Sequence, residues 1–100
     1  MPEGSNNHSV RHVTIVNALG LHARAAAKFV KVAACYNAEV TVIRPDVKKD
    51  NEVSGSSIMG LMMLGAAPGC PLELRATGPA AEAAVVALAD LIANRFDEQV

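Results

Sequence analysis

The sequence predicts a two-layer α+β domain in which three helices cover one face of a four-stranded sheet. Four segments alternate apolar and polar residues with the period of a strand. Three other segments repeat apolar residues at helical spacing. The chain has 100 residues, which is room for a single core. The expected order is strand, helix, strand, strand, helix, strand, helix, and this pattern leaves the order of strands within the sheet open.

Composition narrows the class of protein. Hydrophobic residues make up 51% of the chain and aromatic residues only 3%, so the core must be built from small aliphatic groups. A formal net charge of −1 argues against nucleic acid as a partner. No apolar run approaches the roughly 20 residues of a membrane span, and residues 1–9 lack the apolar stretch of a secretory signal. We therefore expect a cytoplasmic protein without a membrane partner.

The potential metal ligands are scattered. Cys35 and Cys70 lie far apart, and His8, His12 and His22 fall in different predicted contexts. Reduced thiols are expected in a cytoplasmic chain. We expect no metal and no cofactor.

The first half of the chain begins with a polar segment, residues 1–9, which we expect to be a flexible tail ahead of a domain spanning residues 10–96. Residues 10–16 alternate as a half-buried strand, with Val13 and Ile15 on one side. Residues 22–36 read as a helix whose apolar stripe consists of Ala25, Ala26, Phe29, Val30 and Ala33.

That helix also has a basic stripe, formed by Arg24, Lys28 and Lys31. It is either a solvated face or a means of steering an acidic partner. Beyond the helix, residues 38–44 and 52–55 form strands joined by a polar turn at residues 45–51, which predicts a hairpin.

A second helix is expected between Ser57, a favourable N-cap, and Gly65, a favourable stop. It is apolar nearly all round, so it is either fully buried or buried on one stripe and exposed on another. Its methionines suit a contact surface for several partners.

The last strand covers residues 69–77, with Leu72, Leu74 and Ala76 on its apolar side. Gly78-Pro79 is expected to start the final helix, because proline is tolerated in the first turn. Residues 97–100 are expected to form a frayed C-terminal tail. The expected buried side of the final helix consists of Ala81, Ala84, Val85, Leu88, Leu91, Ile92 and Phe96.

His22 is the candidate functional residue. It stands at the start of the first helix, where unpaired backbone N–H groups and the helix dipole attract anions. A neutral imidazole there could accept a phosphoryl group while the N–H groups and Arg24 hold its oxygens. The simpler interpretation is a solvated cap or a core histidine.

Two motifs resemble the HPr family of histidine phosphocarriers of the phosphoenolpyruvate-dependent phosphotransferase system. Gly20-Leu21-His22-Ala23-Arg24 resembles the active-site segment, and Ser56-Ser57-Ile58-Met59-Gly60-Leu61-Met62 resembles the regulatory segment. The resemblance extends over residues 10–96. Within the family, the chain looks most like the HPr proteins of the nitrogen-related branch of the phosphotransferase system. It implies an HPr-like open-faced β-sandwich, with a four-stranded antiparallel sheet and three helices on one face.

The resemblance also implies a function. His22 would accept a phosphoryl group through Nδ1 from enzyme I, itself charged by phosphoenolpyruvate, and pass it to an enzyme IIA-type protein. Arg24 matches the family's phosphate-stabilising arginine. Such a protein is a monomeric phosphoryl carrier rather than a stand-alone enzyme. The family usually has proline where this chain has Ala25, which would loosen the first helical turn slightly.

By the same resemblance, Ser57 matches a serine that HPr kinase/phosphorylase modifies in many relatives. The expected partner-contact residues are Leu21, Lys28, Ile58, Met59 and Met62. The alternative function is a regulatory docking module of the same fold, controlled at Ser57 and carrying little phosphoryl flux. A ferredoxin-like structural or RNA-binding domain is disfavoured by the few aromatic residues and the near-zero charge.

Overall fold

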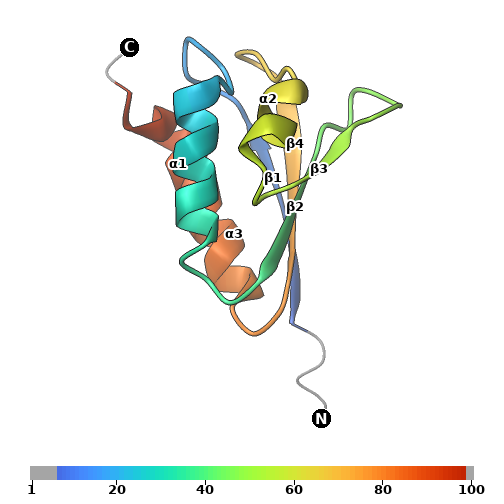
Figure 1. Cartoon of the computed structure of the whole chain (residues 1–100), viewed down its shortest axis with the longest axis vertical. Helices are drawn as coiled ribbons and strands as arrows, with labels where there is room; N and C mark the ends of the chain where they lie inside the picture. The colour runs from blue at the N-terminus through green and yellow to red at the C-terminus, as the bar shows by residue number, and fades with distance from the viewer. Residues whose placement is uncertain (1–6, 99–100) are drawn as a thin grey trace.

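The computed structural model describes residues 7–98. The chain forms the seven expected elements and one short terminal turn, η2 (Figure 1). In order these are β1 (His8–Thr14), α1 (Ala23–Ala33), β2 (Glu39–Ile43), β3 (Glu52–Ser54), α2 (Ile58–Met63), β4 (Pro71–Thr77), α3 (Ala81–Ala93) and η2 (Arg95–Asp97).

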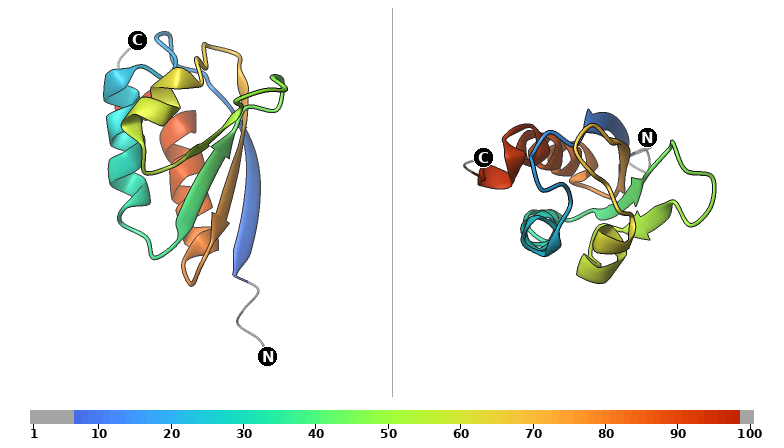
Figure 2. Two further views of the ribbon diagram at one scale, coloured as in Figure 1. Left: turned by 45° about the vertical axis from the view of Figure 1, so that its right-hand side comes forward. Right: turned by 90° about the horizontal axis from the view of Figure 1, so that it is seen from above.

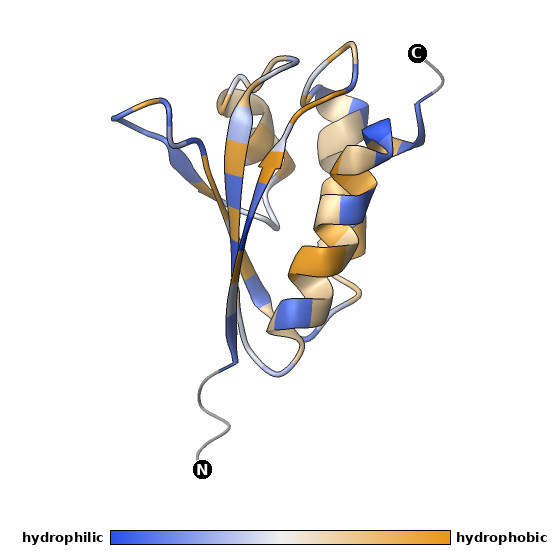
Figure 3. Ribbon diagram, turned by 180° about the vertical axis from the view of Figure 1, so that it is seen from behind, coloured by the Kyte–Doolittle hydropathy of each residue, from blue (hydrophilic) through white to orange (hydrophobic). Residues whose placement is uncertain are grey.

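The strands make one sheet in the order β1-β4-β2-β3, and every neighbouring pair is antiparallel. The helices all lie against the same side of this sheet, which leaves the other side open (Figure 2). Hydrophilic and hydrophobic residues alternate along the strands, as Figure 3 shows from behind. The α+β open-faced sandwich predicted from the sequence is confirmed.

The core fills the space between the sheet and the helices. On β4, Leu72, Leu74 and Ala76 point inward and are at most 1% exposed. They share one core cluster with the alanine-rich faces of α1 and α3, and small side chains let α3 approach the sheet closely. Phe29 and Phe96 are the largest fully buried side chains. Within residues 7–98, no helix is long and apolar enough to cross a membrane.

The ends of several elements differ from their predicted positions, and β4, for example, begins at Pro71 rather than at residue 69. Helix α3 begins at Ala81 rather than at Pro79, because the chain first turns: the Ala81 N–H donates to the Gly78 carbonyl, 3.1 Å away. Gly78 has a φ of +125°, which other residues adopt only with strain. Helix α1 ends at Ala33, and β1 already begins at His8.

The C-terminal segment is folded at least as far as Glu98, where the sequence predicted a frayed tail. Phe96 belongs to the core as expected, yet it lies beyond α3, in η2. The Glu98 side chain is only 10% exposed. The first six and the last two residues of the chain, 1–6 and 99–100, belong to the two expected tails but lie outside the described residues.

The core assignment predicts a contrast between two truncations. Replacing Leu74, which is fully buried, with alanine should lower the free energy of unfolding by about 2–5 kcal/mol, because a cavity remains. Met63→Ala removes a side chain that is 77% exposed and should change stability by less than about 0.5 kcal/mol. Urea denaturation of both variants measures the difference, and equal losses would contradict the burial pattern.

Candidate functional site

The loop that precedes α1 is fixed by main-chain hydrogen bonds to the loop that follows α2. The Ile15 N–H donates to the Cys70 carbonyl at 2.9 Å, and the Leu21 N–H donates to the Ala66 carbonyl at 2.9 Å. Gly20 is required in this loop for two reasons. Its φ is +68°, and a Cβ atom would lie 2.5 Å from the Ala66 oxygen. The two loops therefore form one rigid edge from which α1 starts.

His22 is the N-cap residue of α1, with an extended backbone at φ −81° and ψ −178°. The first helical hydrogen bond runs from the Ala26 N–H to the His22 carbonyl, at 2.8 Å. The N–H groups of Ala23, Arg24 and Ala25 thus precede the helical ladder and have no helix carbonyl to bind. The imidazole does not cap them. The site therefore combines a ring nucleophile with a positive helix end.

The ring of His22 is held by the C-terminal segment. Its side chain is 27% exposed, and its Nε2 donates a hydrogen bond to Oε2 of Glu98. The other carboxylate oxygen, Oε1, accepts a hydrogen bond of 3.1 Å from Nδ2 of Asn17. The hydrogen bond from His22 is the main cause that lowers the pKa of Glu98. The bond from Asn17 and the charge of Lys28 lower this pKa further, whereas partial burial of the carboxyl raises it. Among residues 7–98, Nδ1 of His22 has no hydrogen-bond partner.

Sequence reasoning missed both Glu98 and Asn17. Glu98 lies 76 positions from His22, in a segment whose composition is typical of a tail. Asn17 lies in a loop where asparagine is common in turns. The one signal in the sequence was Phe96, a large aromatic residue of the kind that is usually buried. It indicates that the chain still contacts the core two residues before Glu98.

The predicted basic residues of α1 have different environments. Arg24 is exposed in the first turn, and its guanidinium makes no hydrogen bond or ion pair with residues 7–98. It is thus available to a bound anion. Lys28 is half-buried, and its Nζ donates to the Phe96 carbonyl at 2.7 Å. It therefore ties η2 to α1 in addition to carrying charge.

Helix α2 presents an exposed apolar surface. Ile58 is 42% exposed, Met59 66%, Met62 40% and Met63 77%, and we call these four residues the α2 patch. Leu61 and Leu64 point into the core, so the interpretation of one buried and one exposed stripe holds. Three of the predicted contact residues belong to this patch, and the patch also includes Met63, which was not among the predicted contact residues.

Leu21 requires a correction. It was predicted to lie on the contact surface, but its side chain is only 6% exposed and packs in the core. Its N–H bond to Ala66 directs it inward. The exposed apolar residue of this loop is instead Leu19, at 65%.

Ser57 is the N-cap of α2, as predicted. Its Oγ accepts a hydrogen bond of 2.9 Å from the Gly60 N–H. The side chain is half-buried, while that of the adjacent Ser56 is exposed and bonded to Ser54. The hydroxyl of Ser57 adjoins the α2 patch directly.

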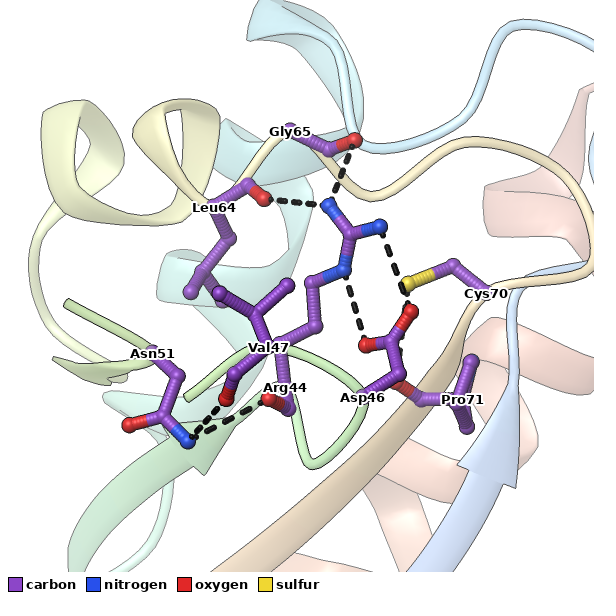
Figure 4. A network of polar contacts seen from close by, with 8 residues as sticks. All are labelled: Arg44, Asp46, Val47, Asn51, Leu64, Gly65, Cys70 and Pro71. Atoms are coloured by element: carbon purple, nitrogen blue, oxygen red, sulfur yellow. Dashed lines mark hydrogen bonds and ion pairs between the residues drawn. The ribbon is translucent and has the colours of Figure 1, made fainter. Parts of the chain in front are cut away.

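The other end of α2 is held by an arginine from the hairpin (Figure 4). Arg44 Nη1 donates to the carbonyls of Leu64 and Gly65, at 2.9 and 3.2 Å. These are C-terminal carbonyls, where a cation is favourable. Asp46 orients the guanidinium through a bond of 3.0 Å to Nε, and this bond lowers the pKa of Asp46. Arg44 therefore stabilises the start of the loop on which Gly20 and Leu21 rest.

The other histidine and thiol side chains of the described residues have different surroundings. Between residues 7 and 98, no three His, Cys, Asp or Glu side chains are arranged to hold a metal ion. Cys70 is buried, which raises the pKa of its thiol, and Cys35 is exposed. His12 lies on the open face of the sheet and contacts Glu73 at 3.1 Å, so it is remote from the α1 terminus.

Comparison with known proteins identifies the family. A family model described as "PTS HPr component phosphorylation site" matches residues 10–94. The chain is 51% identical over 86 residues to phosphocarrier protein HPr of Pseudomonas aeruginosa, covering 86% of this chain and 92% of the relative. It is 41% identical over 88 residues to phosphocarrier protein NPr of Shewanella violacea, covering 88% and 92%.

Solved structures agree. The crystal structure of HPr-C-His from Thermoanaerobacter tengcongensis superposes with a TM-score of 0.81 at 38% identity, covering 92% of this chain and 99% of that one. The family match spans both sequence motifs and all of the sheet except the first two residues of β1. This chain belongs to the HPr family of phosphocarriers of the phosphotransferase system.

Proposed function

We propose that this protein accepts a phosphoryl group on Nδ1 of His22 from phosphorylated enzyme I and passes it to a histidine of an enzyme IIA-type protein. The observation that carries this proposal is the hydrogen bond between Nε2 of His22 and Glu98. With the proton on Nε2, the lone pair of Nδ1 is free to attack. The ring is also accessible, since 27% of the side chain is exposed.

The transfer exchanges one N–P bond for another. The Nδ1 lone pair attacks the phosphorus atom of the donor phosphohistidine, the donor N–P bond breaks, and its electron pair returns to the donor ring. The backbone N–H groups of Ala23 to Ala25 and the Arg24 guanidinium face developing charge on the phosphoryl oxygens. Alignment of the two rings by the docked proteins supplies most of the catalysis. The reverse sequence hands the group on.

Docking requires a surface that several partners can use in turn. The α2 patch offers exposed methionines, whose flexible side chains adapt to different partners. Small, replaceable contacts of this kind suit a transient complex. We therefore propose that Ile58, Met59 and Met62 contact enzyme I and the enzyme IIA-type acceptor, with the protein acting as a monomer in the cytoplasm.

The central prediction concerns labelling from phosphoenolpyruvate. With a competent enzyme I, the wild-type protein should acquire one acid-labile phosphoryl group, as a phosphoramidate does, and His22→Ala should acquire none. The matched control is His12→Ala, which removes an exposed imidazole on the open face of the sheet and should be labelled fully. Radiolabel incorporation with and without acid treatment measures the outcome.

An unlabelled wild type would contradict the carrier function and favour a regulatory docking module of the same fold. Labelling of His22→Ala would place the phosphoryl group elsewhere. A second incubation, with enzyme IIA-type proteins of the sugar and nitrogen-related branches, identifies the acceptor by loss of label from this chain.

We also propose that Ser57 is a regulatory phosphorylation site for an HPr kinase/phosphorylase. A phosphate adds about −1.5 to −2 charges at neutral pH. At the N-terminus of α2 the fold tolerates that charge, because backbone N–H groups face it. The same charge would adjoin the α2 patch and oppose docking of a partner there.

Two serine variants test this regulation. Ser57→Ala should lose labelling by HPr kinase/phosphorylase while Ser56→Ala keeps it. Losing the N-cap bond to Gly60 should cost Ser57→Ala only about 1 kcal/mol, so the variant should remain folded. Undiminished labelling of Ser57→Ala would show that this serine is not the modified group.

A further inference from the structure

The C-terminal segment follows a backbone path that needs an explanation. Arg95, Phe96 and Asp97 all have positive φ, at 57°, 53° and 62°. This left-handed region costs a non-glycine residue roughly 1–2 kcal/mol, and three in succession are rare. After α3 the path turns the chain sideways and brings it beside the N-terminal half of α1, as Figure 1 shows. Surrounding contacts must therefore hold the segment there.

Two of these contacts involve Phe96. Its side chain is fully buried, and its carbonyl accepts the bond of 2.7 Å from Lys28. Anchoring Phe96 would already secure the core, so it does not account for the position of Glu98 two residues later. Glu98 is placed by different partners, namely His22 and Asn17.

Asn17 links the loop before α1 to the C-terminal segment, but one of its polar atoms remains without a hydrogen bond among residues 7–98. Its side chain is fully buried, and Nδ2 donates both to the Gly20 carbonyl, at 2.8 Å, and to Glu98 Oε1. Both acceptors face the amide nitrogen, so the orientation of the amide is fixed. Its Oδ1 is buried without a partner among residues 7–98. Such an atom costs about 1–3 kcal/mol, which a loop built only for stability would avoid.

We propose that Glu98 is a positioning residue for phosphoryl transfer at His22, and that Asn17 orients its carboxylate. This inference rests on the proposed carrier function. The carboxylate keeps the proton of His22 on Nε2 and fixes the ring so that Nδ1 faces outward. Removing the Nε2 proton from the neutral ring would leave an imidazolate, which is a far stronger base than a carboxylate, so the proton stays on the ring throughout.

The same contact matters after transfer. When Nδ1 bonds to phosphorus while Nε2 keeps its proton, the ring becomes a cation, and the Glu98 carboxylate beside Nε2 compensates its charge. On handing the group to the acceptor, the N–P electron pair returns to Nδ1 and the leaving group is a neutral imidazole. Without the Nε2 proton, the leaving group would be an imidazolate, a much poorer one.

Kinetics with phosphorylated enzyme I tests the role in transfer. Glu98→Ala and Glu98→Gln should both lower the maximal rate of His22 phosphorylation about tenfold or more. In serine proteases, replacing the carboxylate that orients the catalytic histidine lowers kcat strongly. In the wild type each carboxylate oxygen of Glu98 accepts one hydrogen bond, from Asn17 and from His22. A glutamine has only one oxygen, so its NH2 group would face one of these two donors and the rate should not be restored. KM for the donor should stay the same, because the Glu98 side chain is only 10% exposed. Glu52→Gln, which removes an exposed carboxylate from the edge strand β3, is the matched control.

Nuclear magnetic resonance tests the contact without any phosphoryl transfer. In the wild type, the Glu98 carboxyl should titrate below its ordinary pKa of about 4.3, because the bond from His22 lowers its pKa. The contact is therefore present at neutral pH and is lost as the pH falls through the lowered value. In His22→Ala the midpoint should move back toward the ordinary value. The ring ¹⁵N shifts of neutral His22 should report Nε2–H in the wild type and a mixture of tautomers in Glu98→Ala.

The outcomes separate the two proposals. An unlabelled wild type would overturn the carrier function, and with it a role for Glu98 in transfer. If the wild type is labelled normally and both Glu98 variants keep the maximal rate of the wild type, the positioning role alone is overturned. A rise in KM without a fall in maximal rate would also overturn it, because a docking contact behaves in that way. Thermal unfolding of each variant verifies that the comparison is made between folded proteins.

Discussion

The position of His22 depends on the close contact between two loops. The loop before α1 can follow its path only because Gly20 lies where a Cβ atom would strike the Ala66 carbonyl. That contact lets the Leu21 N–H bond to Ala66 and turns the Leu21 side chain into the core. The next residue, His22, is then delivered to the N-cap position of α1 with an extended backbone. A residue with a side chain in place of Gly20 would displace the imidazole of His22 from the helix end.

The remaining contacts around the site serve that arrangement. Arg44 fixes the C-terminal end of α2 and thereby the loop that contains Ala66. Lys28 and the buried ring of Phe96 bring the C-terminal segment to the same end of the molecule. That segment supplies the carboxylate on Nε2 of His22. The site is therefore assembled from the two loops, the start of α1 and the chain end, although the sequence motif covers only one of these parts.

The fold was predictable because it follows from local patterns. Alternation along β2 and β4 and the alanine stripe of α1 are signals that a single window of sequence contains. Ser57 and Gly65 marked the ends of α2 correctly, because capping chemistry is local. The start of α3 was predicted at Pro79, two residues too early, because a proline fits a turn as well as the first turn of a helix. The order of strands within the sheet was not predicted, since alternation says nothing about which strands pair.

The candidate site was predictable only in part. His22 and Arg24 were found because they lie within one motif, whereas Glu98 and Asn17 act through contacts between segments distant in sequence. Leu21 was misplaced because an apolar residue next to a functional histidine can face a partner or the core. No local signal distinguishes these directions.

The most direct test of the account is to find which ring nitrogen carries the phosphoryl group after reaction with phosphorylated enzyme I. Correlation of ³¹P with ring ¹⁵N resonances in the labelled protein answers this. The account predicts a phosphorus coupled to Nδ1 of His22, with the proton retained on the nitrogen beside Glu98. A phosphorus coupled to Nε2 would contradict it, because that nitrogen could not then donate to the carboxylate.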